Sequence, residues 1–64
     1  MIEKVKVKLE LETTNPEVLS NPLAVLSDIF QRELVDRLKL GADYGNIQDN
    51  NGNKVGTWNI FLDD

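Results

Sequence analysis

Hydrophobic and polar residues alternate strictly near the start of the chain. From residue 4 to residue 12, every odd position is valine or leucine and every even position is lysine or glutamate. A period of two is typical of a β-strand with one buried and one solvent-exposed face. We therefore predict a strand over about residues 2–12. Its core-facing side chains are expected to be Val5, Val7, Leu9 and Leu11.

Two Asn-Pro pairs follow this strand and precede a longer amphipathic segment. Asparagine caps helices and proline suits the first helical position. Asn15-Pro16 therefore predicts one helical turn, and Asn21-Pro22 predicts a main helix over about residues 22–40, which Gly41 ends. At helical spacing, the apolar arc covers about half of the circumference. It consists of Leu23, Leu26, Ile29, Phe30, Leu34, Leu38 and Leu40, whereas Val25 and Val35 lie outside it.

Residues 44–49 and 54–62 form a predicted β-hairpin around Asn51-Gly52. This dipeptide is typical of a two-residue type I′ turn, in which both central residues have positive φ. A turn centred there pairs Ile47 with Gly56. The face expected to meet the helix carries Ile47, Trp58, Ile60 and Leu62. The opposite, open face carries Tyr44, Asn46, Gln48, Val55, Thr57, Asn59 and Phe61.

Together these elements predict one α+β domain over residues 1–64, in the order β-α-β-β. One helix is expected to pack on one face of a three-stranded, mostly antiparallel sheet. The last strand is the most apolar, which favours the strand order first, third, second. The alternative places the second strand in the centre and makes the sheet mixed.

The composition limits the chemistry that the chain can perform. It has 64 residues, 41% of them hydrophobic, a net charge of −4, and neither cysteine nor histidine. Disulfides and the usual zinc sites are therefore excluded. The sequence places no two carboxylates together in an apolar setting that would shift a pKa, so we expect no catalytic residue, no metal, no cofactor and no enzyme. The acidic balance makes nucleic acid an unlikely partner, and we expect a cytoplasmic protein without a membrane segment.

Two segments could bind a ligand. Lys4, Lys6 and Lys8 form a basic row that Tyr44 and Phe61 could join, as in sheets that bind nucleic acid. The simpler interpretation is that lysines protect an edge strand from aggregation. Residues 49–53 place side-chain oxygens at alternate positions, like a calcium loop. However, the sixth and twelfth positions of that loop require glycine and glutamate, and they are Lys54 and Ile60 here.

The surplus of apolar residues is the most suggestive feature. On the open face, Tyr44, Val55 and Phe61 would be exposed in a monomer, and exposed apolar patches often bind a partner. We therefore favour a non-catalytic protein–protein interaction module, a regulator or inhibitor like those of bacteriophages, that binds a second copy or another protein through the sheet face or an edge. The alternatives are a nucleic-acid-binding sheet and an oligomer that binds a small molecule near Trp58. The candidate interaction residues are Lys4, Lys6, Lys8, Tyr44, Val55 and Phe61.

The chain length and element order resemble those of two groups of small oligomers, the oxalocrotonate tautomerases and the flavin-binding dodecins. The tautomerases need a catalytic proline directly after the initiator methionine. Ile2 occupies that position here, which argues against this activity. A likeness of topology alone implies no function.

Overall fold

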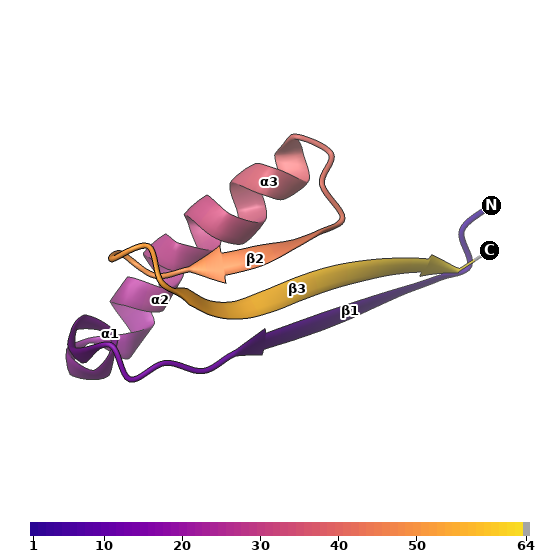
Figure 1. Ribbon diagram of the computed structural model, residues 1–64. Coiled ribbons are helices and arrows are strands. Elements are labelled where there is room, and N and C mark those ends of the chain that lie inside the picture. Colours follow the sequence, from indigo (N-terminus) through magenta and orange to yellow (C-terminus); the bar gives the residue numbers. More distant parts are fainter. Residues whose placement is uncertain (64) are drawn as a thin grey trace.

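The computed structural model describes residues 1–63, which form the α+β domain expected from the sequence (Figure 1). The helix after the first strand and short turn spans 18 residues and includes a π-helical segment in its middle. The elements are β1 (Lys4–Leu11), α1 (Pro16–Ser20), α2 (Pro22–Phe30), η1 (Gln31–Val35), α3 (Asp36–Lys39), β2 (Tyr44–Gln48) and β3 (Lys54–Asp63).

The three strands form an antiparallel sheet in the order β1-β3-β2, which confirms the favoured topology and contradicts the mixed alternative. β1 and β3 pair from Lys4–Asp63 to Leu11–Gly56 and form a long two-stranded ribbon. The helix lies over β2 and over one end of this ribbon only (Figure 1). The far end, where the Glu3 N–H donates to the Asp63 carbonyl at 2.9 Å, has no helix above it. The molecule is consequently elongated, with extents of 44 × 19 × 18 Å.

The helix boundaries have local causes that the sequence indicated. The Asn15 side-chain oxygen accepts a hydrogen bond from the Glu17 N–H at 2.9 Å, which caps α1. Asn21 makes no such side-chain bond, although Pro22 occupies the first position of α2. After α3, Gly41 adopts a φ of 94°, a conformation that glycine takes without steric cost. Its N–H donates to the Leu38 carbonyl and ends the helix.

From Ile47–Gly56 onward the hairpin has the predicted register, but next to the turn Gln48 and not Asp49 pairs with Lys54, and the turn itself differs. Gly52 has a φ of 80°, whereas no described non-glycine residue has a positive φ, so the type I′ turn is wrong. Asp49 pairs with Asn53 through an N–H···O bond of 2.9 Å, leaving a three-residue loop. This loop shifts the pairing by one residue, and a bulge at Val55 shifts it back, so that Ile47 still faces Gly56.

The core lies at the helix-covered end of the sheet. Its fully buried apolar residues are Val18, Ile29, Ile47 and Trp58. The expectation that one face of β1 is buried is wrong over most of its length, because the helix does not reach it: Val5 and Val7 are 59% and 57% exposed.

The buried arc of the helix also differs from the expected one. Leu23 and Leu40 are exposed, whereas Val25, outside the predicted arc, packs against the core. In η1 the Asp36 N–H donates to the Gln31 carbonyl, five residues back. This wider turn changes the rotation per residue, so a constant 100° spacing misplaces the arc.

Candidate interaction surfaces

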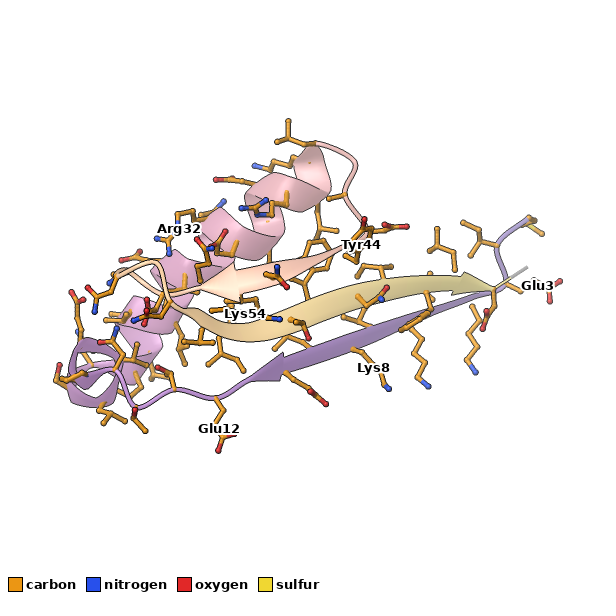
Figure 2. The ribbon with its side chains drawn as sticks, in the orientation of Figure 1. Glu3, Lys8, Glu12, Arg32, Tyr44 and Lys54 are labelled. Carbon is orange, nitrogen blue, oxygen red and sulfur yellow. The ribbon has the colours of Figure 1, made fainter. Side chains whose placement is uncertain are left out.

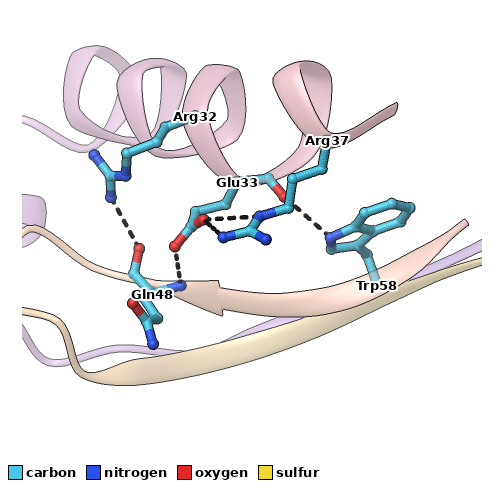
Figure 3. A network of polar contacts seen from close by, with 5 residues as sticks. All are labelled: Arg32, Glu33, Arg37, Gln48 and Trp58. Atoms are coloured by element: carbon cyan, nitrogen blue, oxygen red, sulfur yellow. Dashed lines mark hydrogen bonds and ion pairs between the residues drawn. The ribbon is translucent and has the colours of Figure 1, made fainter. Parts of the chain in front are cut away.

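One end of the outer edge of β2 is covered by side chains from the helix (Figure 3). Glu33, only 3% exposed, accepts a hydrogen bond from the Gln48 N–H at 3.0 Å, and Arg32 donates to the Gln48 carbonyl at 3.0 Å. Arg37 holds the other carboxylate oxygen of Glu33 through two hydrogen bonds of 3.0 and 3.2 Å. Backbone groups that would otherwise be available to another strand are thus occupied at this end of the edge.

The same helical segment anchors the core. The Trp58 indole N–H donates to the Glu33 backbone carbonyl at 3.1 Å, and Trp58 is 2% exposed (Figure 3). Its ring lies against Gly45, where a methyl group would meet Nε1 at 2.9 Å. Since the indole is covered and its N–H is bonded, it presents no free surface to a small molecule within one copy of the chain.

The outer edge of β1, in contrast, is open along its length. β1 is the terminal strand of the sheet and contacts only β3 within it. The Glu12 N–H donates to the Val55 carbonyl at 3.0 Å. The backbone N–H and C=O groups of the even-numbered residues of β1 therefore point to β3. Because bonded and non-bonded pairs alternate in antiparallel ladders, the N–H and C=O groups of the odd residues point to the free edge. Those residues are Val5, Val7, Leu9 and Leu11.

An exposed apolar surface accompanies this edge at the uncovered end of the ribbon. The β1–β3 register places Val5 beside Leu62 and Val7 beside Ile60, on the face that carries Trp58. Leu62 is 55% exposed, like its two valine neighbours. We call this surface the apolar end. It consists of Val5, Val7 and Leu62.

The opposite face carries five of the six residues proposed from the sequence. Lys6 lies beside Phe61, and Lys8 and Tyr44 both lie beside Asn59. Lys8 projects from β1 on the side away from the helix (Figure 2). Lys4 belongs to the same row, with Asp63 as its neighbour. The structure thus brings the basic and aromatic residues together on one face.

Val55, the sixth candidate, does not share this face. It is partly buried and packs against the core cluster. The cause is the bulge, because an extra residue in one strand breaks the strict alternation of side-chain direction. The prediction that Val55 belongs to an exposed open face is therefore wrong.

Asp49 organises the hairpin loop and ties it to α1. Its carboxylate accepts hydrogen bonds from the N–H groups of Asn51 and Asn53, each at 2.9 Å, and from the Asn15 side-chain amide at 2.9 Å. These bonds favour the charged form, with the Asn15 bond the largest influence, and hold the pKa of Asp49 below its ordinary value of 3.8. Side-chain capping of this kind explains why the loop is wider than Asn51-Gly52 alone predicts.

A pH dependence of stability follows from Asp49. Since its pKa is lower in the folded chain, the unfolded chain binds more protons in acid. The stabilisation is fully present well above pH 3.8 and is lost as the pH falls through the lower, folded-state value. We expect urea midpoints measured from neutral pH to about pH 2 to fall less steeply for Asp49→Asn than for the parent chain. Asp28→Asn, on the exposed surface of α2, should keep the parent slope; equal slopes for all three would contradict the assignment.

Glu33 is the important residue that sequence reasoning missed. Glu33 and Arg37, four residues apart with the acid first, form a helical ion pair. Its burial was not expected, although Glu33 follows the buried Ile29 at helical spacing and falls within the apolar arc. A carboxylate in that position signals a buried polar contact.

Comparison with known protein families, curated proteins and solved structures finds no match to this chain. Across residues 1–63, no helix combines the length and apolar character needed to cross a membrane. The same residues contain no cluster of three or more acidic side chains placed to hold a metal ion. The surfaces themselves are thus the basis for a functional proposal.

Proposed function

We propose that this chain is a small non-catalytic protein–protein interaction module, a regulator or inhibitor working in the cytoplasm. Its binding surface is the open edge of β1 together with the apolar end. The observation that carries the proposal is the exposure of Val5, Val7 and Leu62, each more than half exposed on the face that elsewhere forms the core. Large apolar side chains gathered in one patch favour contact with another protein.

The two edges of the sheet support this proposal by their difference. Arg32 and Glu33 occupy backbone groups at one end of the β2 edge, whereas the odd residues of β1 present their N–H and C=O groups along the whole strand. An unprotected edge accepts an additional strand readily, and main-chain hydrogen bonds then supply affinity. A partner that adds a strand beside β1 would also cover the neighbouring apolar side chains.

Site-specific photo-cross-linking in an extract of the source cells tests the proposal. A photo-reactive residue in place of Leu62 should form a protein adduct, whereas the same residue in place of Lys39, on α3, should not. Adding Val7→Asp should abolish the Leu62 adduct, because a charge on the apolar end opposes its burial. Val7 is exposed, so the variant should remain folded. Absence of an adduct at position 62, or one that Val7→Asp leaves unchanged, would overturn the proposal.

A second candidate function, nucleic-acid binding, is favoured by one observation. Lys4, Lys6, Lys8, Tyr44 and Phe61 share the face of the sheet away from the helix. Bases stack on exposed aromatic rings while lysines neutralise phosphates. The net charge of −4 and the acidic Glu10 in the same row oppose such binding.

Binding of a labelled single-stranded oligonucleotide tests this second function. Affinity should fall steeply with salt, and Phe61→Ala and Lys6→Ala should each weaken it, whereas Lys39→Ala should not. No binding to single-stranded DNA or RNA at low salt would remove this candidate.

A further inference from the structure

The charges of β1 are ordered along the strand. Its polar row is basic at the start, with Lys4, Lys6 and Lys8, and acidic at the end, with Glu10 and with Glu12 one residue beyond the strand. When two such strands run antiparallel, each basic half lies beside an acidic half. We propose that two copies of this chain pair through their β1 edges and form one continuous six-stranded sheet. This inference rests on the proposed function and names a second copy as the partner.

One register satisfies the charges of both strands. With Leu9 opposite Leu9 of the second copy, Lys8 lies opposite Glu10 and Lys6 opposite Glu12, and symmetry repeats both pairs. Moving the centre by one residue places Lys8 opposite Lys8, or Glu10 opposite Glu10. Like charges directly opposite each other destabilise a strand pair. The charge order therefore selects the register centred on Leu9.

The hydrogen-bonding pattern of the edge agrees with this register. The free N–H and C=O groups belong to the odd residues of β1, because the even residues face β3. Centring on Leu9 sets odd residues opposite odd residues, with Val7 beside Leu11 of the second copy. These pairs are the ones able to exchange both backbone hydrogen bonds across the new ladder.

The pairing also covers the apolar end. A two-fold axis perpendicular to the sheet leaves the helices of both copies on the same face. In the proposed register Val5 lies beside Thr13 of the second copy, whose α1 begins three residues later, at Pro16. The exposed Leu19 and Leu23 of that copy then approach the exposed Val5 and the rest of the apolar end.

This second contact supplies area that the edge alone lacks. An eight-residue strand is only about 26 Å long, so its edge alone covers little surface, whereas stable interfaces bury about 1,200–2,000 Å² in total.

Assembly also stops at two copies. The two β1 edges pair with each other at the centre of the six-stranded sheet. The outer β2 edges carry the Arg32 and Glu33 contacts, which oppose further pairing.

Charge exchange tests the proposal directly. Light scattering across a hundredfold concentration range should show a dimer for the parent chain. Lys8→Glu and Glu10→Lys should each weaken it by about tenfold to a hundredfold, because each places like charges opposite each other twice. Mixing the two variants should restore a dimer of one copy of each, and the double variant should restore self-pairing.

The chain offers matched controls for these changes. Lys8 lies beside Asn59 and Glu10 beside Thr57 within the sheet, so neither substitution breaks an ion pair inside one copy. Lys39→Glu makes the same charge change on α3 and should leave the dimer intact. Circular dichroism of each variant should report a folded chain.

Amide exchange locates the interface residue by residue. The N–H groups of Val7 and Leu9 should become more protected as concentration rises, whereas that of Lys8, which faces β3, should not change. A dimer that survives Lys8→Glu, or one without added protection at Val7 and Leu9, would overturn pairing through β1. A strict monomer would also overturn it. In that case an adduct of Leu62 with a different protein would leave the proposed function standing, and no adduct would remove both.

Discussion

Replacing Trp58 with alanine should remove a large part of the free energy of unfolding. The indole is 2% exposed, packs with Ile29 and Ile47 in the core cluster, and donates to the Glu33 carbonyl. Removing a buried aromatic side chain costs about 3–5 kcal/mol. A domain of 64 residues has a total stability of about 3–10 kcal/mol. Circular dichroism during urea titration measures the effect, since the variant lacks the only tryptophan fluorophore.

Trp58→Phe serves as the matched control. It keeps an aromatic ring in the core but removes the N–H that bonds Glu33, so its expected cost is only about 1–2 kcal/mol. A smaller effect for alanine than for phenylalanine, or a Trp58→Ala variant with the parent urea midpoint, would contradict the described core. The difference between the two variants measures how much stability comes from packing.

Gly56→Ala is expected to have a comparable effect for a different reason. A methyl group on Gly56 would overlap the Glu10 backbone carbonyl oxygen and would lie 2.9 Å from the Leu11 Cα. These are backbone atoms of β1, so relief requires the strand itself to move. We expect a loss of about 3 kcal/mol or more in the free energy of unfolding, measured by urea titration.

Gly41→Ala separates this steric effect from the general effect of replacing a glycine. Gly41 has a positive φ, but no atom lies within 4 Å of a methyl group placed there. Its expected cost is about 1 kcal/mol, from backbone conformation alone. Equal losses for the two variants would show that β1 and β3 do not approach each other closely at Gly56.

The hairpin shows how a correct register was predicted through an incorrect turn. Asn51-Gly52 marked the position of the turn, and the alternation of apolar residues in β3 set which residues face the helix. The sequence did not indicate that the Asp49 carboxylate would bond two backbone N–H groups and widen the loop. The compensating bulge then moved Val55 from the open face to the core. Hydrogen bonds of this kind form only in the folded loop, so the alternation of apolar and polar residues does not reveal them.

The candidate surface was predicted only in part for a geometric reason. Alternation in β1 identifies a strand and its two faces, but it does not reveal how far the helix extends over them. The five residues of β2 pair with only part of β3, and the helix follows β2. The difference in length between the predicted strands was the available signal, since the strand over residues 44–49 is too short to extend along the whole of the strand over residues 2–12. The apolar end lies on the part of the β1–β3 ribbon that the helix does not cover.

The pairing of β1 with β3 also bears on the order of folding. The helix, the loop and the hairpin are neighbours in sequence, so they can assemble with little chain closure. β1 must wait, because Lys4 pairs with Asp63 and Leu11 with Gly56. Closing that long loop is entropically unfavourable until the hairpin exists to receive the strand. We therefore expect β1 to dock last, and a newly synthesised chain to carry this strand unpaired until residues 54–63 have formed β3.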